Sequence, residues 1–266
     1  MGGERVGVLV KEWRNRRRRS QLDLAVEVGV SSRHLSFVET GRSRPSPELI
    51  LAIARQLDVP LRERNTMLLA AGHAPRYSHT PIDGPEMAPV RRAVQRLLDT
   101  HDPYPGVAVD RQWNVILTNQ AATFLMADLP AHVLSPQPNV FRVCLHPDGL
   151  ATRTLNFEEW AGYLLKQMRR TIRITGDKAL RSLEEEVLSY DNIRRLGERP
   201  ANHEEDPELL VPFRLAHGDA ELSLLTTLTS FGTPQDVTLD ELVVELFYPA
   251  DEPTERRLRQ AAGASR

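Results

Sequence analysis

Apolar residues recur at helical spacing along the first seventy residues of the chain. Ser20 and Gln21 precede a short helical pattern that stops at Gly29, and its apolar positions are Leu22, Leu24, Ala25 and Val28. Glycine suits a sharp turn between crossing helices because it adopts positive backbone angles at little cost. A cap at Ser31 can then start a second helix over residues 32–39.

The second helix of this pair divides into an inner and an outer face. Leu35 and Val38 recur at the spacing of an inward face. In helix–turn–helix pairs that bind DNA, the second helix is the one that enters the major groove. The candidate base-reading residues are therefore those free to face outward, namely Ser32, Arg33, Ser36 and Phe37.

This stretch resembles the helix-turn-helix of the phage-repressor, or xenobiotic-response-element, family of bacterial regulators. The matching features, in order, are SQxxLA, GVS and E-x-G-x-x-x-P. The resemblance implies that Gln21 contacts a DNA phosphate and that the four outward residues meet base edges. Arg33 could then bind O6 and N7 of guanine, and Phe37 could pack on a thymine methyl.

Three further arginines acquire roles from the same resemblance. Arg42 and Arg44, in the loop after the second helix, would be phosphate contacts, and Arg14 would form a structural ion pair with Glu39. The run Arg16 to Arg19 is equally compatible with a solvated helix end and with phosphate contacts. The alternative interpretation is a small helical bundle over residues 9 to 70 with an arginine-rich surface.

Helical periodicity also extends beyond the pair. The segments 47–57 and 61–71 carry apolar residues at helical spacing, which completes a bundle of about five helices. We therefore expect an all-α DNA-binding domain over residues 1–73. A Gly- and Pro-rich stretch over residues 74–89 follows and is interpreted as a linker.

The second half of the chain changes to short strand-like runs. Five are expected, over Val107 to Asp110, Trp113 to Thr118, Leu210 to Ala216, Leu222 to Phe231 and Leu242 to Tyr248. The first two are joined by a tight turn and followed by Asn119, a suitable helix cap. The wording DRQWNVILTNQAA is similar to the opening of PAS sensor domains. An α+β domain with an antiparallel sheet of about five strands is therefore expected over residues 90–253, followed by a tail over 254–266.

Helical patterns occupy the middle of this half. Asn156 and Glu159 have the spacing of a capping box, and a further helix is expected from Asp177 to about Tyr190. Large apolar or amphipathic residues on these elements are candidates for a ligand pocket, although an aromatic stripe at helical spacing is also ordinary core. The candidates are Trp113, Phe124, Trp160, Tyr163 and Phe231.

Nearly the whole chain resembles the MmyB-like branch of these regulators. The matching stretches include PLRERNTMLLAAGHAP, LHPDGLATRTLN and LTSFGTPQDVTLDELVVELFYPADEPT. The resemblance implies a PAS-like ligand-binding domain and a small apolar effector, fatty-acyl-like, with no other cofactor. Arg19 departs from the pattern, because many relatives of the DNA-binding superfamily carry an apolar residue there.

Charge and cysteine content narrow the cellular role. Residues 1–75 hold 13 Lys and Arg against 8 Asp and Glu, whereas the remainder holds 21 against 28. A polyanion such as DNA is therefore expected to bind residues 1–75. The single cysteine, Cys144, excludes an intramolecular disulfide and fits the cytoplasm. No apolar run reaches the length of a membrane span. Since one small module buries limited DNA surface, a homodimer on a double-stranded operator is expected.

Two other classes of function remain open for the second half. An enzyme would need a nucleophile or an acid–base pair, and His146 and Asp148 are the nearest candidates, although His-Pro-Asp-Gly is also a turn sequence. No GxSxG, Walker-type or HExxH motif is present and the histidines do not cluster in the sequence, so no catalytic or metal site is predicted. A protein-binding role would use the acidic stretches 184–186 and 204–206.

Overall fold

The computed structural model describes residues 2–197, 210–218 and 220–264. These residues form two compact units. The first contains Met1–Pro81 with the short segments Arg173–Thr175 and Thr233–Asp240, and the second contains Ile82–Ile172, Gly176–Gly232 and Glu241–Arg266. The acidic stretch 204–206 lies outside the described residues.

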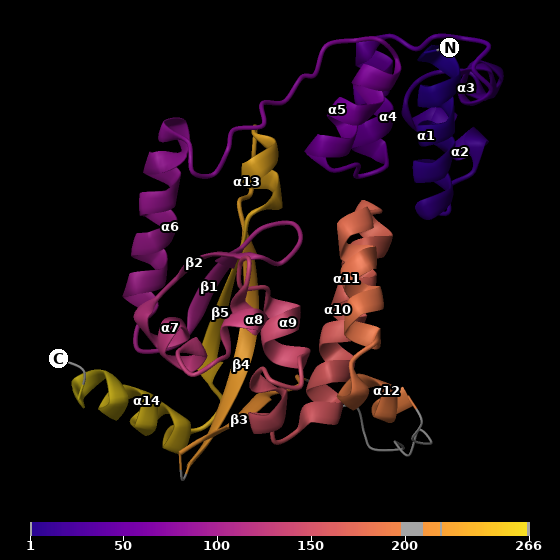
Figure 1. The fold of residues 1–266 in the computed structure, drawn as a ribbon. Helices are drawn as coiled ribbons and strands as arrows, with labels where there is room; N and C mark the ends of the chain where they lie inside the picture. Colours follow the sequence, from indigo (N-terminus) through magenta and orange to yellow (C-terminus); the bar gives the residue numbers. More distant parts are fainter. Residues whose placement is uncertain (1, 198–209, 219, 265–266) are drawn as a thin grey trace. The chain divides into compact units, whose positions relative to one another are not determined.

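Five helices form the N-terminal part of the first unit, as predicted (Figure 1). They are α1 (Gly2–Arg16), α2 (Gln21–Glu27), α3 (Ser32–Glu39), α4 (Pro47–Gln56) and α5 (Leu61–Ala70). The Ser20, Ser31 and Ser46 hydroxyls accept hydrogen bonds from the third amide of α2, α3 and α4, respectively. Gly29, with φ of +71°, makes the turn between α2 and α3.

The apolar positions of the predicted helix α2 are not all buried. Leu22 has an exposed fraction of 62%, whereas Leu24 and Ala25 are buried. A helix of seven residues can bury only one stripe, and Leu22 lies on the side away from Leu24, next to the exposed Val26 one turn later.

The first unit also includes part of the connection between the last two strands. Val237 N–H donates to Ser78 O at 2.8 Å, and Asp236 accepts from the Thr80 N–H and hydroxyl at 3.1 and 2.8 Å. Asp240 accepts from Leu61 N–H at 3.0 Å, at the start of α5. Residues 233–240, which include most of α13 (Val237–Glu241), are therefore held to the first unit by hydrogen bonds.

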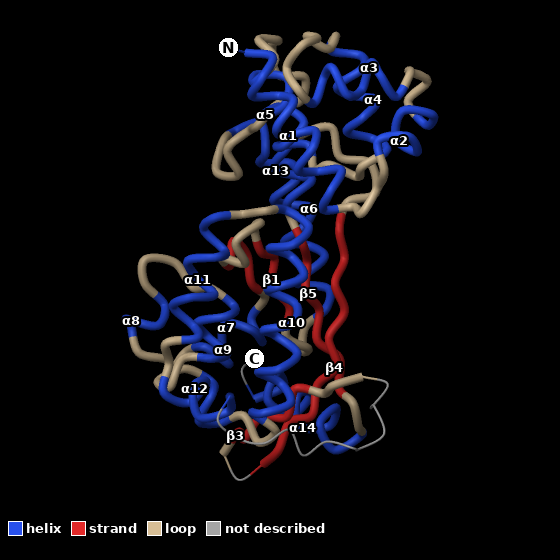
Figure 2. Tube along the Cα trace, turned by 90° about the vertical axis from the view of Figure 1, so that its right-hand side faces the viewer, coloured by secondary structure: helices blue, strands red, loops and turns tan. Residues whose placement is uncertain are grey.

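A five-stranded antiparallel sheet organises the second unit, in the order β2-β1-β5-β4-β3 (Figure 1), and Figure 2 shows its strands in red. The strands are β1 (Gly106–Val109), β2 (Val115–Thr118), β3 (Phe213–His217), β4 (Ala220–Ser230) and β5 (Val243–Pro249). All four neighbouring pairs are antiparallel, so the predicted α+β class with a five-stranded antiparallel sheet is confirmed. The second strand starts later than predicted because Trp113, at φ of +65°, still belongs to the turn.

Helices cover both faces of this sheet. The helices of the second unit are α6 (Ala88–His101), α7 (Gln120–Met126), α8 (Ala131–Leu134), α9 (Val140–Leu145), α10 (Phe157–Thr175), α11 (Lys178–Leu188), α12 (Asp191–Gly197) and α14 (Glu252–Ala264), with 3-10 turns at Pro85–Met87 and Leu150–Arg153. Val94 and Leu98 of α6 pack on Ala108 and Val244 at one face. The larger core lies on the other face and includes Phe141 and Trp160.

Local capping in this unit follows the sequence in part. Asn119 accepts from the Ala122 N–H and caps α7 as expected. Asn156 does not cap α10 with its side chain, so the predicted capping box is wrong. Its amide instead donates to Pro212 O at 2.8 Å, while its oxygen accepts from Arg214 N–H at 3.1 Å, which ties the start of α10 to β3. Leu258 of α14 is buried in the main core, within the stretch expected to form a tail.

Candidate DNA-binding surface and effector cavities

The outer face of α3 carries the four candidate base readers. Ser32 and Arg33 are exposed, Ser36 and Phe37 are half-buried, and Leu35 and Val38 between them are fully buried. The Arg33 guanidinium lies 5.3 Å from the centre of the Phe37 ring, and that of Arg42 lies 5.9 Å from it. Two cationic groups therefore flank one aromatic ring at the end of the candidate recognition helix.

Glu39, the last residue of α3, is the centre of a polar cluster. Its exposed fraction is 7%. Arg14 donates from Nε to Oε1 at 2.6 Å and from Nη2 to Oε2 at 2.9 Å, and Gln21 Nε2 also donates to Oε2, at 2.7 Å. Hydrogen bonding to Glu39 raises the pKa of Arg14 above its usual value. The structure thus places the Gln21 amide on Glu39, which the sequence did not indicate.

Several arginines of the first unit stabilise helix ends. Arg17 donates to Leu57 O and Asp58 O at 2.7 and 2.9 Å, at the end of α4. Arg44 does the same at the end of α5, to Ala71 O and Gly72 O at 2.7 and 3.0 Å. A phosphate contact by Arg44 would therefore have to use its remaining N–H groups. These contacts could not be predicted from the sequence, because nothing near an arginine indicates which helix-terminal carbonyl it will bind.

Arg19 has a specific partner in the same region. It forms an ion pair with Glu27 of α2, and its backbone oxygen accepts from Arg14 Nη1 at 2.9 Å. The position where relatives carry an apolar residue is therefore filled here by a charged side chain that pairs within the unit.

A cavity of about 300 Å³ lies between α7 and α14 in the second unit. We call it the outer cavity. Its lining is largely apolar and includes Phe124, Leu125 and Leu258, while its charged groups are of both signs, namely His217, Arg257, Asp99 and Asp102. The volume is at the lower end of the range for small-molecule sites.

A second cavity, of about 60 Å³, lies inside the main core and is called here the inner cavity. Leu125 lines both cavities. The fourteen residues around the inner cavity are apolar except for Cys144 and Glu245. Burial raises the pKa of the Cys144 thiol to about 12, so the thiol stays protonated at neutral pH.

The five predicted pocket residues lie in different surroundings. Phe124 lines the outer cavity. Trp113 packs against Phe141, with ring centres 5.3 Å apart. Trp160 is stacked between Tyr163 and Phe213 in the main core. Phe231 has an exposed fraction of 41% beyond the end of β4. Of these five, the structure therefore brings one to the wall of a described cavity.

Glu245 was not singled out from the sequence, although a signal was present. In VVELFYP the residues Val243, Glu245 and Phe247 share one side of the strand by their two-residue spacing. Both apolar members of this set pack on the main core. A carboxylate at the middle position is a departure from the apolar pattern of a buried strand face.

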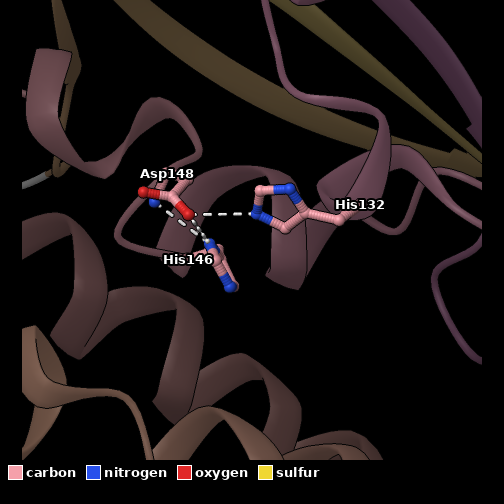
Figure 3. A group of neighbouring side chains, drawn as sticks. All are labelled: His132, His146 and Asp148. Atoms are coloured by element: carbon pink, nitrogen blue, oxygen red, sulfur yellow. Dashed lines mark hydrogen bonds and ion pairs between the residues drawn. The ribbon is translucent and has the colours of Figure 1, made fainter.

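The described part of the chain also brings together three potential metal ligands, His132, His146 and Asp148 (Figure 3). His132 Nε2 lies 3.0 Å from Asp148 Oδ2, and the Asp148 N–H donates to His146 Nδ1 at 3.0 Å. A cation would have to replace that backbone hydrogen bond. The histidines do not cluster in the sequence, but the fold places α8 beside the end of α9 and so brings two of them together.

Acidic residues of α11 are engaged within the second unit. Glu184 accepts from Arg169, and Glu186 accepts from Arg142 at 2.7 Å through both oxygens. These bonds account for two of the three carboxylates in the acidic stretch 184–186. None of the described helices combines the length and the apolar character needed to cross a membrane.

Comparison with known protein families matches both units. Residues 10–64 match the helix-turn-helix model, and residues 90–261 match the model described as the MmyB-like transcription regulator ligand binding domain. The protein is thus a helix-turn-helix transcription regulator with a ligand-binding domain, and not an enzyme. Because the second match covers more than half of the chain, the chain belongs to the MmyB-like family.

Comparison with individual proteins adds little to this assignment. A search of curated proteins finds no match. Among solved structures, the chain is similar to the PAS domain of BvgS from Bordetella pertussis, with 14% identity and a TM-score of 0.27, over 66% of this chain and 98% of that chain.

Proposed function

We propose that this regulator recognises its operator through Ser32, Arg33, Ser36 and Phe37 on the outer face of α3. The observation that carries the proposal is the exposed Arg33 guanidinium beside the Phe37 ring. A guanidinium can donate two hydrogen bonds to guanine in the major groove, and an aromatic ring can pack on a thymine methyl. Gln21, Arg42 and Arg44 would hold the phosphates on either side.

Replacing Arg33 with alanine is expected to weaken binding to the preferred operator by about 5- to 150-fold, the range for one bidentate base contact. The operator is first selected from random duplexes by the wild-type protein, and affinities are then measured by fluorescence anisotropy. Arg33→Lys separates the two possible roles, because lysine keeps a phosphate contact but loses the bidentate geometry.

The control for this experiment is Arg55→Ala, which removes an exposed arginine from α4. It is expected to change affinity for all sequences alike, if at all. Loss of the preference at one operator position in both Arg33→Ala and Arg33→Lys would support a base contact. Wild-type preference in Arg33→Lys, with weaker binding of all sequences by Arg33→Ala, would indicate a phosphate contact instead. Retention of the full wild-type preference by Arg33→Ala would contradict the proposal.

The effector is proposed to be a small apolar, fatty-acyl-like molecule held in the outer cavity. Phe124, Leu125 and Leu258 provide the apolar wall, and the charged residues of the lining are of both signs, His217 and Arg257 with Asp99 and Asp102. The link to DNA affinity is supported by residues 233–240, which join β4 to β5 and are hydrogen-bonded within the first unit. An effector that favours one arrangement of these strands would shift DNA affinity through this segment.

Filling the outer cavity is expected to abolish effector binding. Ala121 lines this cavity, so Ala121→Trp would occupy part of its volume. Native mass spectrometry of the purified protein should detect a co-purifying apolar molecule in the wild type and none in Ala121→Trp. Ala127→Trp, at an exposed position just after α7, is the matched control and should retain the molecule. Equal occupancy in both variants would count against this cavity.

The same spectra test the proposed homodimer. Two recognition helices about one helical turn of DNA apart would read two half-sites and would provide the specificity that a single small module lacks. The protein should therefore appear at twice its chain mass of 30.0 kDa. A protein that stays at the single-chain mass both alone and on its selected operator would exclude the dimer.

A further inference from the structure

Glu245 places a carboxyl group in the apolar interior of the second unit. Its exposed fraction is 2%, and it lies opposite Val107 of β1 and Leu228 of β4 in the sheet register. Its strand neighbours on the same side, Val243 and Phe247, pack on the main core. The carboxyl therefore faces the core and not the α6 side of the sheet.

Only one of the two carboxyl oxygens has a hydrogen bond. Oε1 accepts from the Thr226 hydroxyl at 2.8 Å, whereas Oε2 is buried without a partner. Buried polar atoms in folded proteins are nearly always hydrogen-bonded, because leaving one unpaired is unfavourable. Oε2 is therefore an acceptor that a bound group could satisfy.

The surroundings of this oxygen form a small binding chamber. Glu245 lines the inner cavity, and the residues around that cavity include no lysine, arginine or histidine. The volume of about 60 Å³ suits a polar head group with a few carbon atoms. Leu125 is a wall shared with the outer cavity, so a longer apolar chain would reach that cavity by displacing this side chain.

We propose that the inner cavity binds the head group of the effector and that this head group donates a hydrogen bond to Glu245 Oε2. The ligand class is then an apolar molecule with an amine or hydroxyl head, and not a carboxylate. This inference rests on the proposed function, in which the second unit binds an apolar effector, and it specifies which end of the molecule enters the core.

The protonation of Glu245 is consistent with this assignment. Burial raises the pKa of Glu245 to about 7, against a smaller opposing effect of the Thr226 hydrogen bond. The groups that respond to its charge are Cys144 and Tyr163, whose pKa values are raised first by burial and then by Glu245. Above pH 7 the ionised carboxyl attracts an ammonium group and repels a carboxylate, so the preference between them should grow with pH.

The test compares n-octylamine, n-octanol and octanoate, which share one chain, by calorimetric titration of the full-length protein at pH 6 and pH 8. The amine and the alcohol are expected to bind at least about tenfold more tightly than octanoate at pH 8, with a smaller difference between amine and octanoate at pH 6. Glu245→Leu should remove this preference. Glu245→Gln, which keeps an acceptor oxygen, should retain octanol binding and lose the pH dependence.

Two control variants separate the proposed role of Glu245 from general effects on folding. Glu185→Leu removes an exposed carboxylate of α11 and should leave all three affinities unchanged. Thr226→Val removes the hydrogen bond to Glu245 Oε1 and leaves Oε2 available to the ligand. The preference for the amine and the alcohol over octanoate should therefore persist. Equal binding of all three probes by the wild type, Glu245→Leu and Glu245→Gln would overturn the proposal that Glu245 binds the head group. It would still be consistent with an apolar effector site. Absence of binding of any probe to the wild type would reject both this inference and the proposed effector class.

Discussion

Replacing Glu39 with alanine is expected to destabilise the first unit by about 3–5 kcal/mol, the cost of removing one partner of a buried ion pair. Arg14 would keep its charge in a largely buried position, with its side chain only 11% exposed, and would lose both bonds to the carboxylate. Gln21 would lose its acceptor as well. Glu39→Ala thus removes three side-chain hydrogen bonds at once.

This loss can be measured by hydrogen–deuterium exchange of the α1 and α3 amides, which reports on the first unit separately from the second. Glu12→Ala, at an exposed position of α1, is the matched control and should change stability by no more than about 0.5 kcal/mol. The double variant Arg14→Met, Glu39→Met should recover much of the loss, because it removes the uncompensated charge. If the α1 and α3 amides were equally protected from exchange in Glu39→Ala and in Glu12→Ala, the ion pair of Arg14 and Glu39 would have no structural role.

Replacing Asp177 with alanine is expected to destabilise the second unit by about 3 kcal/mol, from the loss of a buried ion pair and a helix cap. Asp177 pairs with Arg111, accepts from Gln112 Nε2 at 3.0 Å, and caps α11 by accepting from the Ala179 and Leu180 amides. Arg111 would retain Glu241 at 3.1 Å, which limits the effect. Asp128→Asn, at an exposed position, serves as the control for thermal unfolding.

The same carboxylate gives an acid dependence with a defined sign. Burial tends to raise the pKa of Asp177, but the charge of Arg111 and the hydrogen bonds it accepts more than offset this, so its pKa in the folded protein lies below the usual value. Its contribution to stability is therefore present above about pH 4 and is lost as pH falls through the lowered pKa. Asp177→Asn should reduce the loss of unfolding free energy as the pH falls below about 4. An unchanged loss would rule out Asp177 as its source.

Local sequence patterns predicted the elements of both units well. The Ser-capped helices and the turn at Gly29 follow from side-chain hydrogen bonds and backbone angles that depend on a few adjacent residues. The sheet strands could be located because alternating apolar runs are also local. The errors arose where a local pattern competes with a distant partner, as at Asn156, whose amide bonds to Pro212 O and not to its own helix.

The candidate sites divide in a similar way. The outward face of α3 was accessible from periodicity, since the burial of Leu35 and Val38 follows from one helix face. The cavity walls were not, because their members come from elements distant in sequence, such as Leu125 of α7 and Leu258 of α14. Aromatic size was a poor guide to the cavities, since Trp113 and Trp160 fill the core by stacking on other rings.

Caps, turns and apolar periodicity act over a few residues, so a helix-turn-helix pair and a separate α+β domain could be predicted from the amino-acid sequence. The directions of the Gln21 and Arg44 hydrogen bonds and the walls of the two cavities became known from the folded chain. The tertiary structure also places Glu245 in the core with one oxygen unpaired. The physical reason is that burial and hydrogen-bond satisfaction depend on which distant segments pack together.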